Sequence, residues 1–133
     1  MTKGFVRTST ALAIAFTLTS CSVLTGPKEV TLNISNIKAP ATTRVGESFS
    51  VTFTVQYGGC TRFDRLAISK DVTHLNVRAI GIDSSGPNTL CPANIVEEDH
   101  TVVVSDAAAG KFVVQGATYD ANLLTREVLV QSQ

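Results

Sequence analysis

The sequence has no excess of charge of either sign and no long apolar run beyond its N-terminal region. Its 11 basic residues balance 11 acidic ones, so the chain has no overall field that would attract nucleic acid, and we expect no nucleic-acid partner. No segment after the N-terminal region approaches the roughly 20 apolar residues of a membrane span. A length of 133 residues is enough for one domain, which excludes a multidomain enzyme.

Motifs of catalysis and of metal binding are also missing. The sequence contains no Gly-x-Ser-x-Gly elbow, no phosphate-binding glycine loop and no Cys-x-x-Cys pair. Its two histidines, His74 and His100, are too far apart in the sequence to be the paired ligands of a zinc-binding helix. We therefore predict a protein that is not an enzyme and that holds no metal or other cofactor.

The N-terminus has the pattern of a secretory signal peptide. Lys3 and Arg7 form a basic head, and an apolar stretch over residues 11–18 follows. This stretch is too short to cross a bilayer of about 30 Å as a helix. A basic head, a short apolar run and small residues behind it are typical of a signal for export. A buried N-terminal helix is the alternative interpretation.

The end of this segment, Leu18-Thr19-Ser20-Cys21, resembles the lipobox of bacterial lipoproteins. The resemblance implies that residues 1–20 are removed and that the thiol of Cys21 receives a diacylglyceryl group, which would anchor the mature chain to a membrane. Residues 21–28 would form a tether. Ser22 stands where an inner-membrane retention signal would place aspartate, so an exported protein at the outer membrane, on its periplasmic or surface face, is favoured. An ordinary signal peptide that contains a cysteine is the alternative.

Cys60 and Cys91 are the two cysteines that lipidation of Cys21 would leave. Both lie beyond the signal peptide, in an oxidising compartment, and both adjoin turn-forming residues, so we expect a disulfide between them. On the chain-entropy model, closing a loop of about 30 residues between them stabilises the fold by about 3–4 kcal/mol. A metal site or a redox-active dithiol is the alternative.

Alternation of apolar and polar residues dominates the rest of the chain. From Ser48 to Tyr57 every second residue is apolar, and residues 30–34 alternate in the same way. A period of two is typical of strands with one buried face. Ala79 and Ile80 interrupt the period, which predicts a bulge or a strand end there. Further strands are expected at residues 62–69, 75–82, 100–104, 111–118 and 124–130. The expected core contains Leu32, Ile34, Phe49, Val51, Phe53, Val55, Phe112 and Val114.

Seven short strands predict an all-β, seven-stranded antiparallel sandwich over residues 29–133. Residues 44–51 and 109–114 resemble small bacterial immunoglobulin-like or fibronectin-III-like domains, in which a Val-Gly-Glu turn precedes one strand and a glycine precedes the aromatic residue of another. The resemblance implies an immunoglobulin-like fold. The chain differs from antibody domains because it has no tryptophan and because Cys60 and Cys91 are spaced differently, so no antibody-like function is carried over.

The densest cluster of ionisable residues is Glu97-Glu98-Asp99-His100. On a strand, Glu97 and Asp99 would share one face, while Glu98 and His100 would share the other. We interpret the cluster as a solvated edge or loop whose charges discourage strand-to-strand aggregation. A calcium site is the alternative, but the sequence supplies no Asp-x-Asp loop with the further oxygen ligands that it would need.

These features together predict a lipid-anchored cell-envelope protein whose β-sandwich makes protein contacts without catalysis. It would contact the membrane through the lipid on Cys21, and its partner would be another envelope protein. Rigid sandwiches carry binding residues on their loops, so we expect the contact around residues 82–95, beside the predicted disulfide. The candidate partner-binding residues are Asp83, Asn88, Asn94, Glu97 and Glu98.

The alternative functions are inhibition of a peptidase and binding of a small ligand. Residues 39–43, Ala-Pro-Ala-Thr-Thr, share a proline and a Thr-Thr pair with the contact loop of bacterial lipoproteins that inhibit cysteine peptidases. The Gly-x-Gly-Gly loop of those inhibitors is missing from the sequence. A sandwich fold is compatible with each of these functions.

Overall fold

The computed structural model describes residues 26–133, and this part of the chain is all-β. The predicted signal peptide, residues 1–20, and Cys21 lie outside the described residues. Within residues 26–133 no helix is long and apolar enough to cross a membrane. The strands are β1 (Lys28–Thr31), β2 (Asn33–Lys38), β3 (Thr42–Arg44), β4 (Phe49–Gly58), β5 (Thr61–Lys70), β6 (His74–Asp83), β7 (Ile95–Val104), β8 (Gly110–Ala117) and β9 (Leu123–Gln131).

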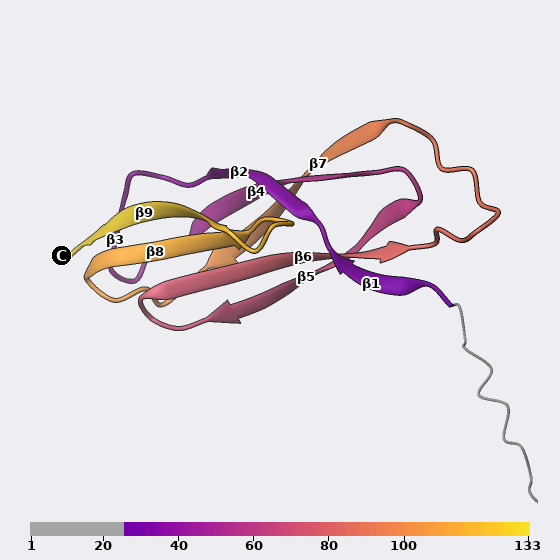
Figure 1. The fold of residues 1–133 in the computed structure, drawn as a ribbon. Coiled ribbons are helices and arrows are strands. Elements are labelled where there is room, and N and C mark those ends of the chain that lie inside the picture. Colours follow the sequence, from indigo (N-terminus) through magenta and orange to yellow (C-terminus); the bar gives the residue numbers. More distant parts are fainter. Residues whose placement is uncertain (1–25) are drawn as a thin grey trace, which may run out of the picture.

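The strands form two sheets that pack on each other (Figure 1). In the larger sheet, β5 pairs along one edge of β6. Two strands share the other edge of β6: β8 pairs with residues 74–77, and β1 pairs with residues 80–83. The sheet continues from β8 to β9 and then to β3. The smaller sheet has the order β2-β4-β7, so β7 is an edge strand.

Inward-facing residues of both sheets fill the core. Phe49 of β4 and Phe112 of β8 meet edge to face across the sheets, with ring centroids 5.6 Å apart. The strand phase that alternation predicts is therefore confirmed. All eight residues expected in the core are buried: Leu32, Ile34, Phe49, Val51, Phe53, Val55, Phe112 and Val114.

The number and direction of the strands differ from the prediction. Residues 26–133 contain nine strands rather than seven, because residues 30–34 are divided between β1 and β2 and because the short strand β3 pairs with β9. The chain passes between the sheets at Leu32, whose N–H donates to the carbonyl of Ala79 at 2.8 Å. The pairs β3–β9 and β6–β8 are parallel, so the prediction of a wholly antiparallel sandwich was wrong. Alternation reports which face of a strand is buried and carries no information on the direction of its neighbour.

β6 runs through Ala79 and Ile80 without the predicted bulge. The irregularity lies in the neighbouring strand, between Phe63 and Arg65 of β5. Ile80 is 6% exposed although it lies outside the main core cluster. Arg65, its register partner, forms an ion pair with Glu29 of β1 at 2.6 Å. This pair spans β6, so a strand with apolar residues on both faces is covered on both.

The two ends of the sandwich differ. At one end, Lys28 of β1 and Thr61 of β5 are both register partners of Asp83, the last residue of β6. The chain therefore enters the fold beside the turn between β4 and β5 and beside the long loop that follows β6 (Figure 1). We call this the disulfide end, residues 26–28, 58–61 and 83–95. The C-terminus lies at the opposite end (Figure 1).

Candidate functional site at the disulfide end

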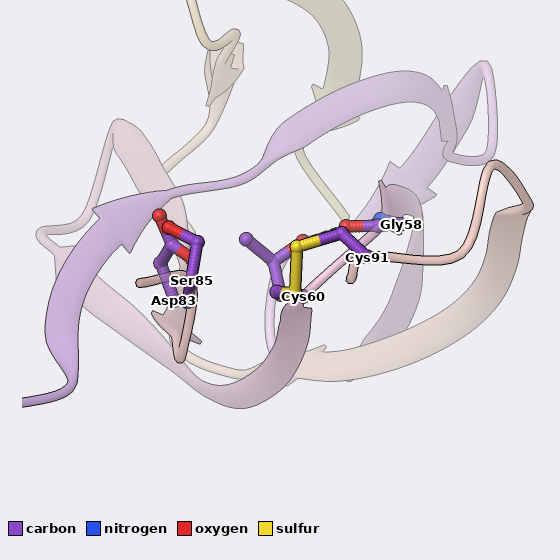
Figure 2. The surroundings of a disulfide bond; sticks show 6 residues. Gly58, Cys60, Asp83, Ser85 and Cys91 are labelled. Carbon is purple, nitrogen blue, oxygen red and sulfur yellow. Dashed lines mark hydrogen bonds between the residues drawn. A yellow bond between two sulfur atoms is a disulfide. The ribbon is translucent and has the colours of Figure 1, made fainter. Parts of the chain in front are cut away.

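The predicted disulfide between Cys60 and Cys91 is present, with the two Cα atoms 5.0 Å apart. Cys60 lies in the tight turn between β4 and β5, and Cys91 lies in the loop of residues 84–94 that leads from β6 to β7. Figure 2 shows the bond with Gly58 and the Asp83–Ser85 segment around it. The disulfide thus ties this loop to the turn through which the chain passes from the smaller sheet to the larger one.

Backbone hydrogen bonds hold both ends of the loop of residues 84–94. The N–H of Ser84 donates to the carbonyl of Cys60 at 3.0 Å, and the N–H of Gly59 donates to the carbonyl of Asn94 at 3.4 Å. Gly58 packs so closely on the backbone of Asn94 that a Cβ atom at this position would overlap its carbonyl oxygen. The Gly-Gly sequence before the first cysteine is therefore required by a close backbone approach as well as by the turn.

Asp83 has a local structural role at the start of the loop. Its carboxylate accepts a hydrogen bond from the N–H of Ser85 at 2.8 Å (Figure 2). This backbone bond, aided by the side chain of Ser85 and the charge of Lys28, lowers the pKa of Asp83. The residue closes an Asx turn, as aspartate commonly does at the end of a strand.

The loop itself presents uncharged side chains to solvent. Asn88 and Asn94, two of the predicted contact residues, are exposed. Leu90 is 97% exposed, more than the other exposed large hydrophobic side chains of residues 26–133. Sequence analysis did not single out Leu90, because its exposure depends on the path of the loop, which no local pattern encodes.

The acidic residues of β7 occupy both faces of that strand, in the predicted arrangement. On the outer face, Glu97 accepts a hydrogen bond from the amide of Gln56. Asp99 accepts hydrogen bonds from the hydroxyl of Thr54 at 2.6 Å and from the ammonium group of Lys38 at 3.1 Å. These two bonds, that of Thr54 first, lower the pKa of Asp99.

The inner face of β7 carries a cluster that sequence reasoning missed. His100 stacks on Phe63 of β5, with ring centroids 3.9 Å apart. Its buried Nε2 atom has no hydrogen-bond partner among residues 26–133 and lies 3.4 Å from a carboxylate oxygen of Glu98. Hydrogen bonding to Glu98 is the main cause of the raised pKa of Tyr57. The only sequence signal for the cluster was the shared face of Glu98 and His100.

The five predicted contact residues do not form one surface. Asp83, Asn88 and Asn94 belong to the disulfide end. Glu97 points to the outer face of β7, and Glu98 points to the inner face, beside Tyr57. The structure therefore divides them between a loop and an edge strand.

Three further observations on the described residues concern possible ligand sites. Within residues 26–133 no three histidine, cysteine or acidic side chains gather where a metal ion could bind. Outside the core, a hollow of about 350 Å³ lies over the larger sheet, where Ala67, Asn76, Ala117 and Leu123 are among its lining residues. Thr42 and Thr43, part of the segment resembling an inhibitor loop, are paired with β9 and are not in a free loop.

A comparison of the chain with protein-family models, with curated proteins and with solved structures found no significant match to any of them.

Proposed function

We propose that the protein is a lipid-anchored, non-catalytic cell-envelope protein whose β-sandwich binds another envelope protein. The open edge of β7 is the observation that supports protein binding. This strand has ten residues. It pairs on one side with β4 and, among the described residues, with no strand on the other side. An open edge of this length offers a row of backbone donors and acceptors to an added strand.

The side chains of β7 indicate what kind of strand would fit. Its outer face carries Glu97 and Asp99 at the centre, with Ile95 77% exposed and Val103 62% exposed towards its ends. A partner segment with basic residues at its centre and apolar residues at its ends would complement this pattern. The acidic centre also disfavours pairing with a second copy of β7, because like charges would then face each other.

The lipid anchor is proposed from the lipobox-like sequence that ends at Cys21. The short tether and the entry of the chain at one end of the sandwich agree with an anchored domain. Export also agrees with the disulfide, because such bonds persist in oxidising compartments. The outer membrane is the favoured location because Ser22 follows the cysteine.

The immunoglobulin-like topology is proposed on two local features. Gly46 has a φ of 84° in the Val-Gly-Glu turn before β4, and Gly110 has a φ of 112° at the start of β8. Both glycines stand at the turns on which the resemblance rests, and both need the left-handed backbone region. The parallel pair β6–β8 is a departure from this topology, whose sheets are antiparallel.

Cross-linking in the native envelope tests the proposed contact. The lipidated protein is cross-linked in intact cells and recovered, and its partners are compared with those of Ile95→Asp and Val103→Asp. We expect both variants to lose an envelope protein that the wild type captures. Leu129→Asp is the control, because Leu129 is 51% exposed on the larger sheet. Capture that survives both β7 variants would contradict the proposal, and capture of a peptidase would favour the inhibitor alternative.

A further inference from the structure

The loop of residues 84–94 has a composition that binding at the β7 edge does not explain. None of its side chains is charged. Its largest aliphatic side chain, Leu90, is 97% exposed, and the exposed Ile95 follows the loop. An uncharged loop with an exposed aliphatic residue can enter an apolar phase without leaving a charge unpaired there.

The exposure of Leu90 is built into an ordered loop. The disulfide fixes the next residue, Cys91, and the N–H of Thr89 donates to the carbonyl of Gly86 at 3.0 Å. The loop is therefore restrained on both sides of the leucine. A restrained loop loses little conformational freedom when it binds, which favours binding through a small contact.

The position of the loop relative to the chain entry points to its ligand. Lys28, where the first strand begins, is the register partner of Asp83, where the loop begins. The tether from Cys21 to Lys28 spans seven residue steps (28 − 21 = 7), which reach at most about 25 Å when fully extended. A lipid on Cys21 would therefore hold Lys28, and the disulfide end with it, within about 25 Å of the lipid attachment point.

We propose that Leu90 of this loop inserts into the interface of the same bilayer that holds the lipid on Cys21. The inference rests on the proposed lipid anchor. A single leucine binds a membrane weakly by itself, but the anchor makes the second contact intramolecular and gives it a high effective concentration. The insertion would fix the orientation of the sandwich, with its disulfide end at the bilayer and the end that carries the C-terminus away from it.

Fluorescence tests the insertion, because the natural chain contains no tryptophan. Leu90→Trp is prepared as the full lipidated protein and reconstituted into phosphatidylethanolamine–phosphatidylglycerol vesicles that contain brominated acyl chains. Val72→Trp is the matched control, since Val72 is 56% exposed in the turn between β5 and β6, at the opposite end. We expect bromine to quench the fluorescence of the Leu90→Trp variant several-fold more strongly than that of the Val72→Trp variant.

A second measurement avoids substituting the loop, because tryptophan itself prefers membrane interfaces. The unsubstituted lipidated protein, with methyl-labelled leucines, is placed in nanodiscs that contain spin-labelled lipid. The methyl signals of Leu90 should broaden strongly, and those of Leu129, which is 51% exposed near the opposite end, should not.

The outcomes separate this inference from the proposed anchor. A chain that does not float with the vesicles overturns the anchor and the insertion together. A chain that floats with them, but shows equal quenching in the two tryptophan variants and equal broadening at the two leucines, overturns the insertion alone. Preferential quenching and broadening at position 90 support it.

Discussion

Phe53 and Thr52 are neighbours on β4 and face in opposite directions. Phe53 is fully buried between the sheets, whereas the hydroxyl of Thr52 is on the outer face, 3.0 Å from that of Thr101. Phe53→Ala should lower the free energy of unfolding by about 3–5 kcal/mol, because it leaves a cavity. Thr52→Ala should lower it by less than about 1 kcal/mol. Denaturant unfolding of both variants measures the difference, and equal losses would contradict the strand phase.

Asp99 makes the stability of the smaller sheet dependent on pH. Its pKa is lowered in the folded protein, first by the hydroxyl of Thr54 and then by Lys38. A carboxyl with a lowered folded pKa contributes stability above its unfolded pKa of about 3.9, and this contribution is lost as the pH falls through the folded value.

The expected result is that Asp99→Asn loses less stability than the wild type as the pH falls below about 4. Unfolding curves measured across this range provide the comparison. The effect should be small, because the carboxylate is exposed and screened by solvent. Identical pH dependence in the two proteins would show that these hydrogen bonds do not favour the charged form.

His100 illustrates what the sequence could not reveal about single residues. Alternation placed it correctly on the same face as Glu98. Its stacking on Phe63 depends on how β5 approaches β7, two strands in different sheets. No local pattern encodes that approach. In the same way, the exposure of Leu90 depends on the path of a loop that is tied at Cys91, and the sequence does not encode that path locally.

β7 extends further than its sequence suggested, because cross-strand pairing outweighs local propensity. Glutamate and aspartate are poor strand formers, and the strand was expected to begin at His100. It begins at Ile95. The polar outer face of β4 supplies a partner for both acidic side chains on the outer face of β7, namely Gln56 for Glu97 and Thr54 for Asp99. The bounds of β4 itself were predicted to within one residue, because its alternation is unbroken.

The division of residues 30–34 between two sheets left no trace in the sequence. Val30, Leu32 and Ile34 alternate regularly, and all three contribute to the same core. Because both sheets face this core, the inward period continues while the chain changes sheets. Hydrophobic pattern alone therefore predicted one strand where the structure has two.

The disulfide should contribute a large share of the stability of so small a domain. Cys60 and Cys91 are 31 residues apart, and the chain-entropy model gives about 3–4 kcal/mol for a loop of this size. Thermal unfolding with and without reductant should show a clearly lower Tm for the reduced protein. A peptide map of the native protein should recover the two cysteines in one linked peptide. Two free thiols in the unreduced protein, or an unchanged Tm after reduction, would contradict the role of the bond.

The two ends of the molecule differ in the features that they carry. The chain enters at the disulfide end, the loop with Leu90 extends from the same end, and the C-terminus lies at the other (Figure 1). β7 leads away from the disulfide end. A membrane contact at that end would therefore leave the open edge of β7 accessible along the side of the sandwich, where an added strand could pair with it.

Anchoring through Cys21 is the claim on which this arrangement depends. It is tested most directly by mass spectrometry of the N-terminal peptide of the mature protein, combined with membrane fractionation of the wild type and Cys21→Ser. We expect the mature chain to begin at a diacylglyceryl-modified Cys21, and we expect Cys21→Ser to leave the membrane fraction or to retain its uncleaved signal. An unmodified Cys21, or a variant that fractionates and migrates like the wild type, would contradict the anchor.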